Sequence, residues 1–298
     1  MSLIRLTLII CVFIVSVAPW VVAQDCTSYV VVNAYNHKLA FDLVTLKATD
    51  FEAKMGSTPL SIVSSEQNYK SRLLVLVEVD RSGDDQKVAE VVDTVTKMAR
   101  QAPDGQPVAY GVYAGKAVFT KGFFPDPDER DKAISAVREE ANSLGKRVAM
   151  FDSLREAFKL FGPHQPGDTV LLVGFPYDDR SSHSAGDIEK LFLESGTRLM
   201  TMLREPMSSN SRDFLFNSHT AEKTFFLEFP EKTGGAHSHF DSHFFGWNWR
   251  GYLLAVKVPG NKVKSSPERW KLKFRGVAGD VFKKAELYYP AMLPPCKQ

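Results

Sequence analysis

Oxygen-bearing side chains alternate directly after a strongly apolar segment in the first third of the chain. The segment from Arg72 to Val79 is followed by Asp80, and Ser82 and Asp84 come at alternate positions after it. A carboxylate, a hydroxyl and a second carboxylate at this spacing can present oxygen ligands to one hard cation such as Mg²⁺ or Ca²⁺. The same residues also suit the start of a helix, where Ser82 or Asp84 would accept hydrogen bonds from backbone amides. The spacing alone favours this capping interpretation.

A second group of residues that could do chemistry is a histidine cluster near the carboxyl end, formed by His237, His239 and His243. Imidazoles this close together can hold Zn²⁺ or Cu²⁺, and a catalytic zinc needs three protein ligands and one open place. The chain has no His-Glu-x-x-His motif, which is typical of one large class of metalloproteases. We expect these histidines to lie in a loop beside aromatic residues. A metal-binding protein or a metal-dependent hydrolase built on them is the alternative function.

No residue pattern of a known class of enzyme site stands out. The chain lacks the Gly-x-Ser-x-Gly of a nucleophile elbow, a phosphate-binding loop and a dinucleotide fingerprint. Paired acids such as Glu139 and Glu140 are typical of a solvated helix face. We therefore expect a protein that is not an enzyme and has no cofactor, unless the Asp80 loop holds Mg²⁺ or Ca²⁺.

The overall charge indicates neither a nucleic acid nor an anionic membrane surface as a partner. Lys and Arg together number 37 and Asp and Glu 35, so that the formal net charge is +2. The length of 298 residues suits one large domain with a small accessory layer.

The first 23 residues have the pattern of a secretory signal peptide. Arg5 is the only charge before an apolar run from Leu6 to Ala18, and Val21-Val22-Ala23 offers small or apolar residues before a cut. We predict cleavage after Ala23, which makes the mature protein secreted or periplasmic. An uncleaved membrane anchor is the alternative, although the run is short for a spanning helix of roughly 20 residues. We expect no membrane span after cleavage.

Two cysteines remain when Cys11 leaves with the signal peptide. Cys26 and Cys296 stand at the two ends of the mature chain, and in an oxidising compartment two cysteines most simply pair. Two free thiols and a disulfide to another chain remain as alternatives. If the internal bridge forms, the two termini meet.

Two kinds of hydrophobic period alternate through the middle of the chain and predict an α/β fold. Nearly continuous apolar strands separated by helical periods are typical of a doubly wound, mostly parallel sheet. We predict strands at 72–79, 108–113, 116–120, 169–173, 198–203 and 225–229. We predict helices at 88–98, from 127 onwards, and at 149–160, 185–194 and 209–221.

The two ends of the mature chain are rich in strands instead. The predicted strands are 29–32, 38–43 and 59–63 at the amino end, and 252–258, 270–274 and 286–289 at the carboxyl end. We expect them to form an accessory antiparallel β layer. The predicted organisation is a signal peptide (1–23), a strand-rich segment (24–70), an α/β domain (71–230), and a carboxyl-terminal part (231–298) that packs with the amino-terminal segment.

Several short motifs resemble one protein family. Aspartate, any residue, serine after the first buried strand resembles the opening of the metal-ion-dependent adhesion site of von Willebrand factor A domains. More specifically, the chain is similar to the bacterial secreted proteins called von Willebrand factor A-related, in the order of four further motifs. These are Thr49-Asp50-Phe51-Glu52, Met150-Phe151-Asp152-Ser153-Leu154, Thr233-Gly234-Gly235 and Tyr252-Leu253-Leu254.

The resemblance implies a metal site that this chain has partly lost. The family's site takes Asp and two Ser from a first loop, Thr from a second and Asp from a third. Asp80 and Ser82 match, but Asp84 stands in place of the second Ser, Val148 in place of the Thr and Gly174 in place of the third-loop Asp. Asp178 and Asp179 are candidates to substitute as ligands. Since Mg²⁺ demands near-ideal oxygen coordination, we expect a degenerate site without a metal.

The resemblance also implies a function as a non-enzymatic protein-binding module that meets its partner at the carboxyl ends of the strands. The residues that we expect to contact the partner are Asp80, Ser82, Asp178, Asp179, Arg180 and Ser182. A structural subunit of an envelope assembly is a plainer alternative. The identity of the partner does not follow from the sequence.

Overall fold

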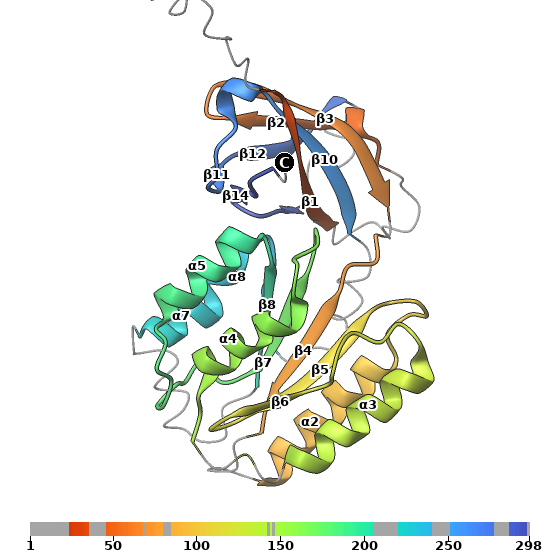
Figure 1. The fold of residues 1–298 in the computed structure, drawn as a ribbon, viewed down its shortest axis with the longest axis vertical. Helices are drawn as coiled ribbons and strands as arrows, with labels where there is room; N and C mark the ends of the chain where they lie inside the picture. The colour runs from red at the N-terminus through yellow and green to blue at the C-terminus, as the bar shows by residue number, and fades with distance from the viewer. Residues whose placement is uncertain are drawn as a thin grey trace, which may run out of the picture.

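The chain folds into two layers that are stacked end to end (Figure 1). The computed structural model describes residues 24–35, 46–67, 69–79, 85–141, 144, 147–204, 220–239, 251–276 and 286–296. One layer is an α/β sheet with helices on both faces, and the other is an antiparallel β layer. This arrangement confirms the predicted fold class.

The sheet of the α/β layer is mostly parallel, and its strand order is β6-β5-β4-β7-β8-β9. The strands are β4 (Leu73–Glu78), β5 (Val108–Tyr113), β6 (Ala117–Phe119), β7 (Thr169–Gly174), β8 (Arg198–Leu203) and β9 (His237–His239). Only β6 pairs antiparallel among these described strands. When these six strands are numbered in chain order, they lie in the order 3-2-1-4-5-6, which is typical of a doubly wound sheet. The direction in which the chain adds strands to the sheet changes between β4 and β7. Ligands of such sheets bind at the carboxyl ends of the strands beside this reversal.

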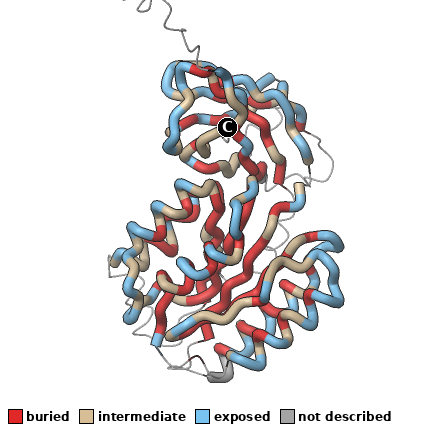
Figure 2. The backbone as a smooth tube through the Cα atoms, viewed as in Figure 1, coloured by how far each residue is buried: buried red, intermediate tan, exposed pale blue. Residues whose placement is uncertain are grey.

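Helices cover both faces of this sheet because successive strand residues point to opposite sides. The odd-numbered residues of β4, such as Val75, pack with α2 and α3, and the even-numbered ones, such as Leu76, pack with α4, α5, α7 and α8. The helices are α2 (Asp85–Arg100), α3 (Pro127–Glu140), α4 (Met150–Phe161), α5 (Ala185–Ser195), α7 (Ala221–Leu227) and α8 (Phe229–Lys232). Every residue of β4, β5, β7 and β8 is buried, as Figure 2 shows.

The predicted strand at 225–229 was wrong, because this segment lies in helices. Thr220 caps α7 by accepting a hydrogen bond from the backbone N–H of Lys223 (3.2 Å). Phe225, Phe226 and Phe229 are then all buried in the core beneath α7 and α8. A short apolar run is compatible with both a buried strand and a buried helix, so its periodicity could not distinguish the two elements.

The segment that follows was also predicted wrongly, since His237 to His239 do not lie in a loop. They form β9, which pairs parallel with β8 and extends the α/β sheet beyond residue 230. The Thr233-Gly234-Gly235 motif makes this possible. Thr233 Oγ1 accepts a hydrogen bond from Leu199 N (2.8 Å), and a Cβ on Gly235 would lie 1.7 Å from the Leu199 carbonyl oxygen. The glycine therefore lets the chain approach β8 closely.

The second layer combines strands from both ends of the chain, as predicted. Its strand order is β12-β2-β3-β10-β1-β13, and every pairing in it is antiparallel. Its strands are β1 (Cys26–Tyr35), β2 (Phe51–Met55), β3 (Thr58–Gln67), β10 (Tyr252–Val258), β12 (Lys271–Phe274) and β13 (Glu286–Tyr288), with a separate pair of β11 (Glu268–Arg269) and β14 (Met292–Leu293). A disulfide joins Cys26 to Cys296, which confirms that pairing.

Some predicted elements lie outside the described residues. These are the signal peptide at 1–23, the strand at 38–43 and most of the helix at 209–221. Within the described part of the chain, no helix combines the length and the apolar character needed to cross a membrane.

Candidate functional site

The candidate site lies at the carboxyl ends of β4, β5, β7 and β8, at the end of the α/β layer that points away from the antiparallel layer (Figure 1). The predicted ligands Asp80, Ser82 and Asp84 lie outside the described residues. The structure does describe the residues on which that loop stands, together with the second- and third-loop positions of the family's metal site. What these residues do is therefore the basis for judging the site.

A buried ion pair occupies the reversal point of the sheet. Glu78, the last residue of β4, is 3% exposed, and its Oε1 accepts a hydrogen bond from Arg204 Nη2 at 3.0 Å. Its Oε2 accepts a hydrogen bond from the backbone N–H of Phe175 at 2.7 Å. The backbone N–H of Arg204 in turn donates to the carbonyl of Gly174 at 2.8 Å. One carboxylate thus ties together the ends of β4, β7 and β8.

Gly174 leaves the space that this arrangement needs. A Cβ at Gly174 would lie 2.6 Å from Glu78 Oε2 and 2.7 Å from the hydroxyl oxygen of Tyr113. Burial raises the pKa of Tyr113 well above its ordinary value of 10, and the negative charge of Glu78 raises it further. Tyr113 therefore stays protonated, and its hydroxyl has no hydrogen-bond partner among the described residues.

The described positions do not fit the metal site that the family would place here. Val148, at the position of the family's Thr, is buried and apolar, and Gly174, at the position of the family's third-loop Asp, has no side chain. The carboxylate of Glu78, which lies beside Gly174, already forms an ion pair with Arg204. In the part of the chain that the structure describes, no three or more His, Cys, Asp or Glu side chains are grouped so that they could hold a metal ion.

Asp178 and Asp179 bind the amino end of α4. Asp178 Oδ2 accepts hydrogen bonds from Phe151 N (2.9 Å) and from the hydroxyl of Ser181 (2.6 Å). Asp179 Oδ1 accepts one from Val148 N (2.9 Å). The residue that precedes α4, Ala149, has no side chain that could cap it, so the loop after β7 supplies the acceptors that the helix start lacks. Their substitution as metal ligands stays a prediction.

Asp152, in the first turn of α4, holds the same loop from the other side. Its carboxylate accepts hydrogen bonds from the backbone N–H and hydroxyl of Ser182 and from the backbone N–H of His183. His183 Nδ1 lies 2.7 Å from Asp152 Oδ1. Burial raises the pKa of Asp152, but the hydrogen bonds from Ser182 and His183 outweigh this and bring the pKa below its ordinary value of 3.8. The loop from 177 to 184 is thus fixed to α4 at two points.

The fixed loop presents a small exposed surface that includes Tyr177, Asp179, Arg180 and Ser182. Tyr177 is one of the exposed large hydrophobic residues, with 44% of its surface accessible. We call these four residues the loop surface. Three of them belong to the predicted contact set, and Tyr177 is an addition that an aromatic residue in a polar loop could have signalled.

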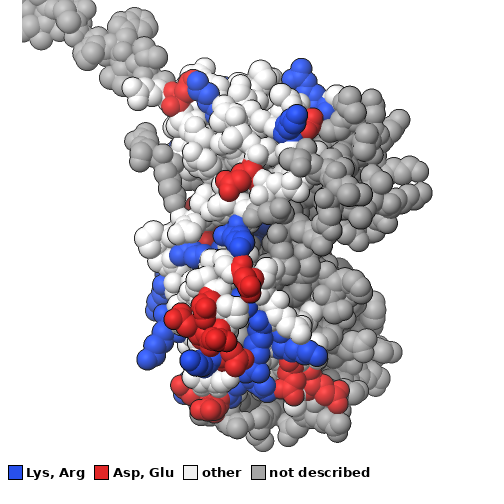
Figure 3. All heavy atoms as spheres, turned by 90° about the vertical axis from the view of Figure 1, so that its right-hand side faces the viewer, with Lys and Arg blue, Asp and Glu red and all other residues white. Residues whose placement is uncertain are grey.

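The charges on the neighbouring face of the α/β layer alternate in sign. Figure 3 shows basic and acidic side chains interspersed over the lower half of the described surface. Arg100 pairs with Asp131 at 2.6 Å, and Arg138 pairs with Asp93, each between α2 and α3. Among the described residues of this face, neither sign of charge forms a continuous patch.

The histidine cluster is only partly described. The Nδ1 of His237 lies 3.3 Å from Thr201 Oγ1, and its ring packs edge-on to Phe226 with 6.3 Å between ring centroids. The side chain of His239 and the whole of His243 lie outside the described residues. A metal held by all three histidines stays a prediction.

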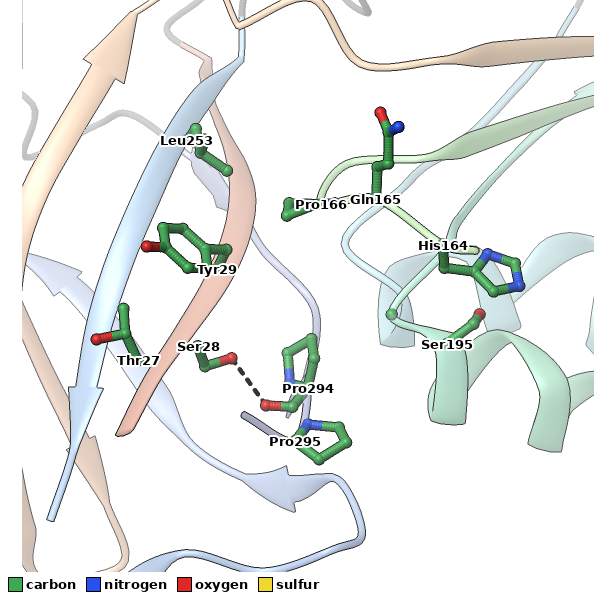
Figure 4. Close-up of a pocket in the computed structure, with 11 residues that line it drawn as sticks. Thr27, Ser28, Tyr29, His164, Gln165, Pro166, Ser195, Leu253, Pro294 and Pro295 are labelled. Atoms are coloured by element: carbon green, nitrogen blue, oxygen red, sulfur yellow. Dashed lines mark hydrogen bonds between the residues drawn. The ribbon is translucent and has the colours of Figure 1, made fainter. Parts of the chain in front are cut away.

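A pocket of about 340 Å³ lies at the opposite ends of the parallel strands, between the two layers (Figure 4). Several of its polar groups are bonded within the protein: Ser28 Oγ donates to the carbonyl of Pro294 (2.7 Å), and Ser195 Oγ donates to Thr197 Oγ1 (2.8 Å). Its remaining lining includes Tyr29, Leu253, Pro166 and Pro295. Each of these bonds lies within one layer, and the pocket lies far from the predicted site.

Glu78 and Arg204 were missed by our sequence reasoning. The signal that could have found them is a charged residue at the carboxyl end of a mostly apolar strand, as at Glu78 in the strand 72–79 and at Arg204 directly after the strand 198–203. Such a charge is buried with the strand and needs a partner.

No protein-family profile and no curated protein sequence matches the chain. Similar solved structures include an aerotolerance-related membrane protein from Bacteroides fragilis, which is 14% identical (60% of this chain, 96% of that chain, TM-score 0.46). A von Willebrand factor type A protein from Catenulispora acidiphila is 11% identical (85% and 71%, TM-score 0.44). The manganese-loaded TRAP protein from Plasmodium vivax is 12% identical (71% and 82%, TM-score 0.42). The likeness concerns the fold alone.

Proposed function

We propose that this protein is a non-enzymatic, extracytoplasmic protein-binding module with a degenerate metal-ion-dependent adhesion site, and that it meets its partner at the carboxyl ends of the parallel strands. The observation that carries the proposal is the loop surface. Asp152 and Asp178 fix its backbone from both sides, and Tyr177 and Arg180 face solvent. A rigid, exposed aromatic residue beside an arginine is the composition typical of a binding hot spot.

The position of this loop supports the proposal. It follows β7, directly beside the reversal of strand order between β4 and β7, where open α/β sheets bind their ligands. The loss of oxygen ligands at Val148 and Gly174 supports a degenerate metal site. The contact set that we propose is Asp80, Ser82, Asp178, Asp179, Arg180 and Ser182, with Tyr177 added.

The extracytoplasmic location is supported by two features. The first is the predicted signal peptide, and the second is the Cys26–Cys296 disulfide, since such bridges persist in oxidising compartments. Amino-terminal sequencing of the protein from its native cells tests this part of the proposal. We expect the mature chain to begin at Gln24, and an intact amino terminus would contradict it.

A photo-crosslinking amino acid at Tyr177 tests the binding surface. Tyr29 is the matched control, because it is also an exposed tyrosine (49% against 44%) but lies in the antiparallel layer. We expect irradiation of producing cells to give a discrete crosslinked species from position 177 and none from position 29. The crosslink should weaken when Arg180 is replaced by Glu in the same chain.

The opposite pattern would place the interface elsewhere. A crosslink from position 29 alone would move binding to the antiparallel layer. A crosslink from position 177 that Arg180→Glu leaves unchanged would show that the loop surface is merely near the partner.

A further inference from the structure

The ion pair of Glu78 and Arg204 lies beside Gly174, the residue that the resemblance places at the third-loop aspartate of a von Willebrand factor A-like metal site. We infer that the guanidinium of Arg204 takes the place of the divalent cation, so that the site is neutralised from within and binds without a metal. This inference rests on the proposed function, because it specifies how the same site is built. It concerns residues that the structure describes.

The carboxylate stands in the space of the missing acid. The Oε2 of Glu78 lies 2.6 Å from the position of a Cβ on Gly174, the residue that replaces the family's third-loop aspartate. A side chain at position 174 and the carboxylate of Glu78 therefore exclude each other. The negative charge has been kept at this place, but it now comes from the neighbouring strand β4.

The positive charge of the pair is also supplied by the protein, through the guanidinium of Arg204. Arg204 follows β8, is 9% exposed and donates to Glu78 at 3.0 Å. A guanidinium is a cation whose five N–H donors lie in a planar fork. A divalent cation placed beside Glu78 would meet this charge at close range and in a poorly solvated environment, where repulsion is strong.

The donors of Arg204 are only partly satisfied within the described part of the chain. Among the described residues, the Nε and Nη1 of Arg204 and the hydroxyl of Tyr113 have no hydrogen-bond partner although they are buried. Buried pairs of this kind are often no more stable than an apolar replacement, and unpaired buried donors carry a further cost.

Thermal unfolding of the mature protein in EDTA and in millimolar Mg²⁺, Mn²⁺ or Ca²⁺, with NaCl at matched ionic strength, tests the inference. We expect the wild-type midpoint to be the same in all of these solutions. Arg204→Met removes the counter-charge of the buried Glu78 carboxylate, so the midpoint of this variant in EDTA should fall by about 10 °C. Mn²⁺ should then raise the midpoint of this variant, because a ligand that binds only the folded state stabilises it.

Two further variants distinguish the effect of the charge at position 204 from a general loss of stability. Arg204→Lys keeps the charge and should show no response to Mn²⁺. The double variant Glu78→Gln with Arg204→Met has no buried charge, so it should recover part of the lost midpoint and should also ignore Mn²⁺.

Three results would overturn the inference. They are a wild-type midpoint that rises with a divalent cation, an Arg204→Met variant that does not respond to Mn²⁺, and a double variant whose midpoint in EDTA is no higher than that of Arg204→Met alone. The crosslinking experiment at Tyr177 is independent of these measurements. A crosslink without the metal response sinks only this inference, and the metal response without a crosslink sinks only the proposed function.

Discussion

Arg72 and Asp168 form a bidentate ion pair between the start of β4 and the turn before β7. The two contacts are Nε to Oδ1 at 2.9 Å and Nη2 to Oδ2 at 2.6 Å, and Asp168 is fully buried. The same guanidinium donates to the carbonyls of Phe161 (2.7 Å) and Pro163 (2.9 Å). Arg72 therefore holds the end of α4 and the turn after it against the central strand of the sheet.

Replacing Arg72 by Ala should destabilise the protein strongly. Removing one partner leaves the carboxylate of Asp168 buried without its counter-charge, which costs about 3–5 kcal/mol. Urea unfolding at neutral pH measures this loss. Arg100→Ala is the control, because the Arg100–Asp131 pair is largely exposed (36% and 56%) and should contribute no more than about 1 kcal/mol. Equal losses of unfolding free energy in the two variants would contradict the claim that burial makes the Arg72–Asp168 pair the more important one.

Gly174→Ala should also destabilise, although it adds only one methyl group. The added Cβ would overlap Glu78 Oε2 and the Tyr113 hydroxyl, and forcing an extra carbon into a packed site costs about 1–3 kcal/mol. Gly186→Ala in α5 is the matched control, since the nearest atom to its Cβ would be 3.8 Å away. That variant should be unchanged or more stable by up to about 1 kcal/mol, because alanine favours helix. An unchanged Gly174→Ala variant would mean that Glu78 can move.

The hydrogen bonds to Asp152 should appear as a pH dependence. Its pKa is lower in the folded protein than the ordinary 3.8, so its contribution to stability is present above 3.8 and is lost as the pH falls through the folded value. Asp152→Asn should therefore be less stable than the wild type at about pH 5, and the difference should shrink below about pH 3. Urea unfolding of both proteins across this range measures it. A difference that grows in acid would mean that the sign of the shift is wrong.

Reducing the Cys26–Cys296 bridge should lower the unfolding midpoint markedly. The cysteines are 270 residues apart, and closing so long a loop stabilises by on the order of 5 kcal/mol in the chain-entropy model. We expect Cys26→Ser with Cys296→Ser to unfold at lower temperature than the wild type, and the reductant to affect only the wild type. If the double variant matches the oxidised wild type, β1 and the carboxyl end are held by their other contacts, such as Ser28 Oγ to the carbonyl of Pro294.

The strands and helices of the α/β layer were predictable wherever an apolar run or a helical repeat of apolar residues was long enough. β4 is an unbroken apolar run, and α2 repeats Val88, Val92 and Val95 at helical spacing. The segment with Phe225 and Phe226 was too short for its period to be recognised. β9 could not be predicted because its three residues are a strand only through their pairing with β8.

For the candidate site, the sequence showed which ligands of the family's site are missing, but not what replaces them. Gly174 and Val148 count as losses only through the resemblance to the family's motif. Glu78 and Arg204 are 126 positions apart and meet only because β4 and β8 both lie beside β7 in one sheet. A contact between such distant residues depends on strand order, which a local pattern does not contain.

The sequence by itself therefore determined the α/β class and the absence of a side chain at Gly174, and it predicted the antiparallel layer and the pairing of Cys26 with Cys296 as the simplest of several possibilities. The fold class and the antiparallel layer follow from hydrophobic periodicity, and the missing side chain follows from the residue type. The expected cysteine pair follows from the fact that only two cysteines remain after the predicted signal peptide. Only the tertiary structure decided that Asp178 and Asp179 bind the start of α4 and that Arg204 neutralises Glu78. The physical reason is that a buried charge takes its partner from whatever the fold brings within a few ångströms, and the chain order does not reveal that distance.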